Sequence, residues 1–116
     1  MNKIFFLSTC DTCKRIINEL DLKEKNFDFQ DIKTQKITAA QLEELKTKAN
    51  SYEALFSKIS RKYKELKLSE KNLTENEMKK YILEEYTFLK RPVILIKDKV
   101  FIGNSKATIA EAKKAL

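Results

Sequence analysis

The sequence has very little glycine, proline, cysteine or histidine, and each shortage excludes a class of structure. Its 116 residues include one Gly, one Pro, two Cys and no His. So few Gly and Pro leave no flexible linker and argue against an all-β fold, which needs many tight turns. A zinc site needs about four ligands, so we expect no metal site within one chain. The length fits one domain with one hydrophobic core.

Long apolar runs are absent as well. No stretch approaches the roughly 20 apolar residues of a membrane span. The N-terminus lacks the basic region and long apolar stretch of a secretory signal. We therefore expect a cytoplasmic protein without membrane association, and a pair of cysteines with no others fits that reducing compartment better than a secreted disulfide scaffold.

The net charge is +7, from 24 Lys and Arg against 17 Asp and Glu. The lysines alternate with glutamates, as in Glu43 and Glu44 followed by Lys46 and Lys48. Such mixing indicates solvated helix faces with intrahelical ion pairs. No aromatic–basic stacking motif of an RNA-binding sheet is present. We expect no direct nucleic-acid binding, although a preference for acidic partners or anionic substrates remains an alternative.

Both cysteines lie in the segment from Ser8 to Arg15, in the pattern Cys10-x-x-Cys13. The preceding run, residues 4–7, is too short for a helix and rich in aromatic and branched residues, so it predicts a buried strand. After the pair, apolar residues recur at helical spacing, which places Cys13 in the first turn of a helix. A strand that ends in Cys-x-x-Cys and leads into a helix is a typical setting of a redox motif.

A helix N-terminus favours negative charge and lowers the pKa of a thiol there. Lys14 and Arg15 add positive charge close by. Cys10, first of the pair, is therefore the predicted nucleophile, and Cys13 is predicted to resolve a mixed disulfide. Three alternatives remain: buried cysteines that act as small apolar residues, a structural disulfide across a short loop, and a metal or iron–sulfur cluster shared by two chains.

The other patterns predict an α/β fold. Residues 26–32 alternate apolar and polar, so they predict a strand that forms a parallel βαβ unit with the first strand and helix. Residues 93–96 and 100–102 predict a hairpin, and a last helix begins near Ser105. With helices inserted in the middle, this order is the thioredoxin-type layout. We expect a thioredoxin-like fold with a mixed four-stranded sheet, in a single domain over residues 1–116.

The helical insertion spans about residues 38–89 and is predicted to hold three helices. Thr38 with Gln41, and Thr74 with Glu77, match the capping-box pattern that opens a helix. Ser51 is predicted to cap the helix between these two. That middle helix carries Tyr52, Leu55, Phe56 and Ile59.

The only proline, Pro92, marks the start of a strand, because proline does not fit inside a central strand. An ordinary trans proline at a strand start is one reading. In thioredoxin-type folds the proline at this point is usually cis, and its loop faces the reactive cysteine. We therefore expect a cis Arg91–Pro92 bond that lies close to Cys10.

The strand–Cys-x-x-Cys–helix start, the helical insertion and residues 89–94 resemble the ArsC family. That family holds glutathione/glutaredoxin-dependent arsenate reductases, the Spx redox regulators and related proteins such as YffB. The resemblance covers essentially the whole chain, and residues 55–57 and 63–68 are similar to the family's middle segment.

In the arsenate reductases of this family, one cysteine attacks arsenate and three arginines hold the oxyanion. The resemblance implies that Cys10 is the nucleophile and that Arg91 is the arginine before the proline. The second arginine would fall within residues 57–59, where none stands, although Arg61 is close. The third would fall near residues 101–104, where Lys106 is the nearest cation. Because lysines do not reproduce bidentate guanidinium contacts, we expect an anion pocket short of arginines.

The Cys-x-x-Cys pair also resembles the redox switch of Spx, which binds the C-terminal domain of the polymerase α subunit. Two functions therefore stay open. One is a reductase of an oxyanion or a disulfide, with no bound cofactor and with glutathione, glutaredoxin or thioredoxin as electron donor. The other is a redox-sensing regulator that contacts RNA polymerase. We expect a monomer in which the catalytic residues are Cys10, Cys13 and Arg91. The predicted substrate-binding residues are Thr9, Asp11, Thr12, Lys14, Arg61 and Pro92.

Overall fold

The computed structural model describes residues 2–116 of the chain. The chain divides into two compact units. The first unit joins the chain up to Gln35 with Arg91–Leu116, and the second is Lys36–Lys90. The second unit covers the segment in which the sequence places the helical insertion.

The first unit is built on a mixed four-stranded sheet, as expected from the sequence. Its strands are β1 (Lys3–Phe6), β2 (Asp28–Asp31), β3 (Val93–Ile96) and β4 (Lys99–Ile102), in the order β2-β1-β3-β4. β1 is parallel to β2 and antiparallel to β3, and β3 and β4 form the predicted antiparallel hairpin. The C-terminal ends of β1 and β2 and the N-terminal end of β3 therefore lie at the same end of the sheet.

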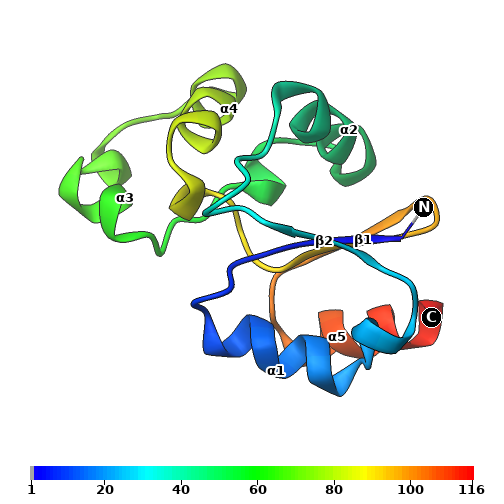
Figure 1. Cartoon of the computed structure of the whole chain (residues 1–116). Coiled ribbons are helices and arrows are strands. Elements are labelled where there is room, and N and C mark those ends of the chain that lie inside the picture. The colour runs from blue at the N-terminus through cyan, green and yellow to red at the C-terminus, as the bar shows by residue number, and fades with distance from the viewer. Residues whose placement is uncertain (1) are drawn as a thin grey trace. The chain divides into compact units, whose positions relative to one another are not determined.

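Two helices, α1 (Asp11–Glu19) and α5 (Lys106–Ala115), cover the same face of this sheet (Figure 1). A 3-10 turn, η1 (Leu22–Glu24), follows α1. α5 begins after Ser105 as predicted, and the Ser105 hydroxyl accepts the Thr108 N–H at 3.1 Å. The buried core between helices and sheet consists of Ile4, Ile16, Ile17, Leu20, Leu22, Ile94, Ile96, Ile109 and Ala112.

The second unit is helical. It contains α2 (Ala39–Ala49), α3 (Arg61–Glu65) and α4 (Glu75–Glu84), with the 3-10 turns η2 (Glu53–Leu55), η3 (Leu68–Glu70) and η4 (Tyr86–Phe88). Both predicted capping boxes are confirmed. Thr38 accepts the Gln41 N–H at 3.0 Å, Thr74 accepts the Glu77 N–H at 3.2 Å, and each partner side chain accepts the N–H of its threonine in return.

The predicted middle helix after Ser51 is wrong. Only the turn η2 forms there, and Phe56 has extended backbone angles (φ −84°, ψ 125°). Phe56 forms an isolated β-bridge with Leu89 and stacks on Phe88, with ring centroids 5.3 Å apart. These contacts with a distant part of the chain override the local helical pattern. The next helix, α3, starts at Arg61, and Ile59 lies outside it with 86% of its surface exposed.

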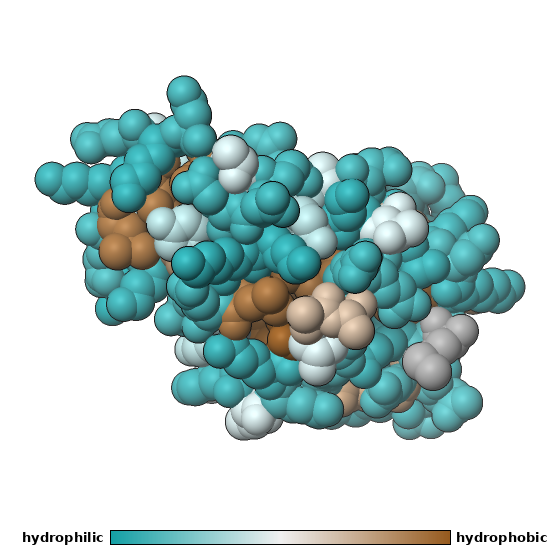
Figure 2. All heavy atoms as spheres, turned by 90° about the horizontal axis from the view of Figure 1, so that it is seen from above, coloured by the Kyte–Doolittle hydropathy of each residue, from teal (hydrophilic) through white to brown (hydrophobic). Residues whose placement is uncertain are grey.

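The face of the molecule in Figure 2 is mostly hydrophilic, with apolar side chains in separate patches. The large apolar residues exposed among residues 2–116 are Ile59, Leu66 and Leu116. None of the helices in that range has the length and apolar character needed to cross a membrane.

Candidate redox site

The reactive segment lies where β1 passes into α1. After Phe6 the chain makes a turn, closed by a hydrogen bond from the Cys10 N–H to the Leu7 carbonyl at 3.0 Å. Cys10 is the extended N-cap residue of α1, and Cys13 lies in the first turn, as predicted. Both are free thiols; Cys10 is half-buried, whereas Cys13 is fully buried together with Ile16 and Ile17.

The pKa of the Cys10 thiol is lowered from its ordinary value. Partial burial opposes the charge, but the backbone N–H and the thiol of Cys13, the backbone N–H of Thr12 and the guanidinium of Arg91 stabilise the thiolate. Sγ of Cys10 makes no N-cap hydrogen bond in the structure, and the amides of Thr12 and Cys13 act by stabilising the charged form of the thiol. This direction is the one expected from the sequence, and the amides at the N-terminus of α1 supply part of the shift.

The pKa of the Cys13 thiol moves in the opposite direction. Burial raises it to about 11, and the nearby Cys10 adds to the increase, although the Leu7 N–H and the charge of Arg91 oppose it. Cys13 is therefore protonated at neutral pH, and its S–H is a donor to the Cys10 thiolate. The pair thus combines one thiol that ionises easily with one that keeps its proton.

Arg91 reaches this site because of the sheet register. β1 and β3 are antiparallel with Phe5 opposite Val93, so the register, continued past the strand ends, sets Arg91 opposite Leu7. The Arg91–Pro92 bond is cis, as predicted. Arg91 is half-buried and Pro92 is buried. The site therefore joins α1 with the entrance of β3.

The two cations that follow the motif in the sequence lie on the solvent side of α1. Lys14 and Arg15 are both exposed, and Arg15 lies 4.0 Å from Glu19 as an i,i+4 ion pair. The guanidinium that stabilises the Cys10 thiolate belongs to Arg91. The sequence-based reason for the low pKa of Cys10 is corrected on this point, because helix geometry directs positions 14 and 15 away from the buried face that holds Cys13.

The remaining predicted residues occupy different places. Thr9 is exposed in the turn before Cys10, Asp11 is the exposed first residue of α1, and Thr12 contributes its backbone N–H. Arg61 is the exposed first residue of α3, in the second unit. Its part in substrate binding, like the other assigned roles, stays a prediction.

A polar contact beside the motif was not predicted from the sequence. Asp31 ends β2 and is paired with Phe6 in the sheet. Its carboxylate accepts the Ser8 hydroxyl at 2.5 Å and the Ser8 N–H at 3.4 Å. Partial burial works against the charge, but the Ser8 hydroxyl and the N–H groups of Lys33 and Ser8 hold the pKa of Asp31 below its usual value. The only sequence signal for Asp31 is its position at the end of the second strand.

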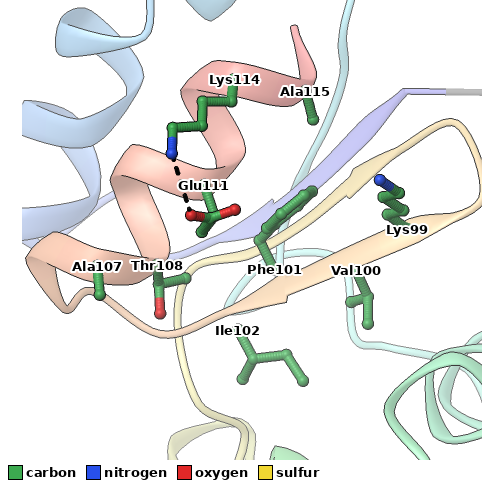
Figure 3. Close-up of a pocket in the computed structure, with 9 residues that line it drawn as sticks. All are labelled: Lys99, Val100, Phe101, Ile102, Ala107, Thr108, Glu111, Lys114 and Ala115. Atoms are coloured by element: carbon green, nitrogen blue, oxygen red, sulfur yellow. Dashed lines mark ion pairs between the residues drawn. The ribbon is translucent and has the colours of Figure 1, made fainter.

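No group of three or more Cys, His, Asp or Glu side chains within residues 2–116 could hold a metal ion. A cavity of about 520 Å³ lies between β4 and α5 (Figure 3). Phe101 points from β4 toward α5, where Lys114 and Glu111 form an ion pair of 3.5 Å. Neither cysteine nor Arg91 lines this cavity, so the cavity is separate from the candidate redox site.

Comparisons with known proteins agree with this architecture. The model of the ArsC family matches residues 5–112. The chain is similar to a solved structure of an arsenate reductase from Vibrio cholerae, with 14% identity, a TM-score of 0.80 and coverage of 99% of this chain and 97% of the other. It is also similar to a YFFB protein, with 21% identity, a TM-score of 0.81 and coverage of 97% of this chain and 98% of the other. A third similar structure is an arsenate reductase (ArsC) related protein from Brucella melitensis, with 22% identity, a TM-score of 0.73 and coverage of 99% of this chain and 95% of the other. Among curated proteins nothing matches significantly. The thioredoxin-like fold expected from the sequence is confirmed.

Proposed function

This chain belongs to the ArsC family, and we propose that it is a thiol-dependent reductase with Cys10 as nucleophile and Cys13 as resolving thiol. The opposite pKa shifts of these two neighbouring thiols carry the proposal. A thiolate is the nucleophilic form of cysteine, so Cys10 is suited to the first attack. Cys13 keeps its proton until a mixed disulfide has formed and a second attack is required.

With a disulfide R–S–S–R′ as substrate, the Cys10 thiolate attacks one sulfur, and R′–S⁻ leaves with the electron pair of the broken bond. Cys13 then gives up its proton to a leaving thiolate and attacks Sγ of Cys10. R–S⁻ leaves and takes a proton from solvent. The substrate has gained two electrons and become two thiols, and the protein holds a Cys10–Cys13 disulfide. An external thiol donor, such as glutathione with glutaredoxin, or thioredoxin, then returns the two electrons.

With arsenate as substrate, Sγ of Cys10 would replace one arsenate oxygen, which leaves as water. Attack of Cys13 on Sγ of Cys10 would then break the S–As bond, release arsenite with the electron pair of that bond, and leave the same disulfide. Of the three guanidinium positions expected for such an anion, only Arg91 is filled by an arginine in this sequence. A lost hydrogen bond to a charged group costs about 1.5–3 kcal/mol, roughly tenfold or more in affinity. We expect arsenate to be reduced at least about a hundredfold less efficiently than by a relative with all three arginines.

The test is a coupled reductase assay on the full chain with arsenate, a small disulfide and a glutathionylated peptide. Each substrate is combined with a glutathione/glutaredoxin or a thioredoxin system, and consumption of NADPH is followed. We expect turnover of at least one disulfide substrate that is abolished in Cys10→Ser and retained in Arg15→Ala, a change at an exposed position of α1 that pairs with Glu19. Absence of turnover with every pair of substrate and donor would contradict a reductase. Efficient turnover of arsenate would contradict the expected shortage of anion contacts.

The second candidate function is a redox-sensing regulator of a reducing cytoplasm. The observation in its favour is that the two free thiols are neighbours and that one guanidinium, that of Arg91, stabilises Cys10. A switch between dithiol and disulfide would need no anion pocket. The matching test is binding to the purified C-terminal domain of the RNA polymerase α subunit, before and after oxidation. Binding that changes with oxidation in the wild type but not in Cys10→Ser would support this function, and binding in neither state would contradict it.

A further inference from the structure

The thiol chemistry of this site depends on backbone groups in a short segment. The N–H groups of Thr12 and Cys13 stabilise the Cys10 thiolate, and the Leu7 N–H acts on the thiol of Cys13. These groups belong to the turn between β1 and α1 and to the first turn of α1. A small displacement of the turn relative to α1 would therefore change the environment of Cys10.

Asp31 holds that turn from the neighbouring strand. One carboxylate oxygen, Oδ2, accepts the Ser8 hydroxyl at 2.5 Å, and the other, Oδ1, accepts the Ser8 N–H at 3.4 Å. Oδ1 also accepts the Lys33 N–H at 3.2 Å, which fixes the carboxylate on the side of β2. The backbone adds a bond from the Ile32 N–H to the Phe6 carbonyl at 2.9 Å. Hydrogen bonds from β2 therefore fix the position of Ser8, two residues before Cys10.

We propose that Asp31 is a positioning residue for the reactive thiol, whose carboxylate fixes Ser8 and thereby keeps Cys10 at the N-terminus of α1. This inference rests on Cys10 being the nucleophile of the proposed function. It adds to that function a residue from β2, outside the Cys-x-x-Cys motif.

A positioning role and a purely electrostatic role of Asp31 predict opposite results. The titratable groups that face Cys10 are Cys13 from α1 and Arg91 before β3. If Asp31 acted through its negative charge, its removal would relieve repulsion and make the Cys10 thiolate more stable. If Asp31 positions the turn, its removal loosens the arrangement of amides around Cys10, and the thiolate becomes less stable.

The experiment measures the rate of Cys10 alkylation by iodoacetamide as a function of pH in the full reduced chain, with the labelled peptide identified by mass spectrometry. The variants are Asp31→Ala, Asp31→Asn, Ser8→Ala and the conservative Ser8→Thr. Asp28→Ala is the matched control, since Asp28 is an exposed acid at the other end of β2 that pairs with Lys3 at 2.9 Å. Thermal melting followed by circular dichroism confirms that each variant is folded.

We expect Asp31→Ala and Ser8→Ala to move the inflection of the alkylation rate of Cys10 to higher pH. Alkylation at pH 7 should slow by about threefold or more, which corresponds to a rise of about half a unit in the pKa of Cys10. Asp31→Asn, which keeps one acceptor, should shift it less, and Ser8→Thr and Asp28→Ala should resemble the wild type. A downward shift in Asp31→Ala, or no shift in both Asp31→Ala and Ser8→Ala, would overturn the positioning role. A wild-type inflection at or above about 8.5, the value of a free thiol, would instead overturn Cys10 as the nucleophile.

Discussion

Replacing Arg91 by alanine should raise the pKa of Cys10 and slow every reaction of its thiolate. The Arg91 guanidinium is the cationic group that stabilises this thiolate, and it reaches Cys10 from the entrance of β3. Without it, the remaining stabilisation comes from the amides of α1 and from the Cys13 thiol. The thiolate fraction at neutral pH should fall, because the ionised form alone loses a partner.

The size of the effect follows from the kind of contact. A hydrogen bond to a charged group contributes about 1.5–3 kcal/mol, and one pKa unit corresponds to about 1.36 kcal/mol, so full loss in a dry site would raise the pKa by roughly one to two units. Arg91 is only half-buried, so water replaces part of the lost interaction. We therefore expect an increase of about half to one unit, which slows alkylation at pH 7 by roughly three- to tenfold.

The assay is the pH dependence of Cys10 alkylation by iodoacetamide in the full reduced chain. Arg15→Ala is the matched control, because it also removes one arginine but from an exposed position paired with Glu19. Arg91→Lys should give an intermediate shift, since lysine keeps the charge but not the planar geometry of the guanidinium. An equal shift in Arg15→Ala and Arg91→Ala would refute the reasoning, because it would show a general charge effect instead of a contact with Arg91.

Three further predictions concern the thiol pair and the second unit. Mild peroxide should link Cys10 to Cys13 within one chain, reversibly by dithiothreitol, and mass spectra with only intermolecular dimers or irreversible oxidation would contradict a resolving role for Cys13. The folded state should lose stability as the pH rises from about 9 toward 11. Burial raises the pKa of Cys13 to about 11, so in this range the thiol loses its proton in the unfolded chain but keeps it in the folded chain. Denaturant unfolding of the wild type should show more of this loss than that of Cys13→Ser, and equal loss in both would contradict the prediction. Thr38→Ala and Thr74→Ala should each lower the free energy of unfolding by about 1 kcal/mol, the usual contribution of an N-cap, and unchanged unfolding midpoints would show that the capping boxes do not contribute to stability.

Features encoded by neighbouring residues were predictable from the sequence. The capping boxes at Thr38 and Thr74 depend only on residues three positions apart, and both form. The position of Cys13 in the first turn of α1 follows from the apolar spacing after it. The β3–β4 hairpin likewise follows from two strand-like runs separated by a short polar turn. In each case the chain adopts the structure that its local pattern favours.

Features that depend on register between distant segments were not predictable in the same way. Phe56 has a helical apolar pattern around it, yet its bridge to Leu89 and its stacking on Phe88 select an extended backbone. The sequence predicts the contribution of the helix N-terminus to the low pKa of Cys10, but it assigns the nearby positive charge to Lys14 and Arg15, and only the family resemblance points to Arg91. The cationic partner of Cys10 is Arg91, which the antiparallel pairing of β1 and β3 brings to the site. The contact of Asp31 with Ser8 depends in the same manner on the pairing of β1 with β2.

The pKa of Cys10 is lowered and that of Cys13 is raised, so reduction of the proposed Cys10–Cys13 disulfide would take up fewer protons than reduction of a disulfide between ordinary thiols. Between the lowered pKa of Cys10 and the value of about 11 for Cys13, the reduced pair carries one proton and the disulfide carries none. Two electrons therefore enter with one proton instead of two. The reduction potential then changes by about 30 mV per pH unit instead of about 59 mV. If the pair forms this disulfide as proposed, its oxidising strength relative to a donor with ordinary thiols would therefore vary with pH.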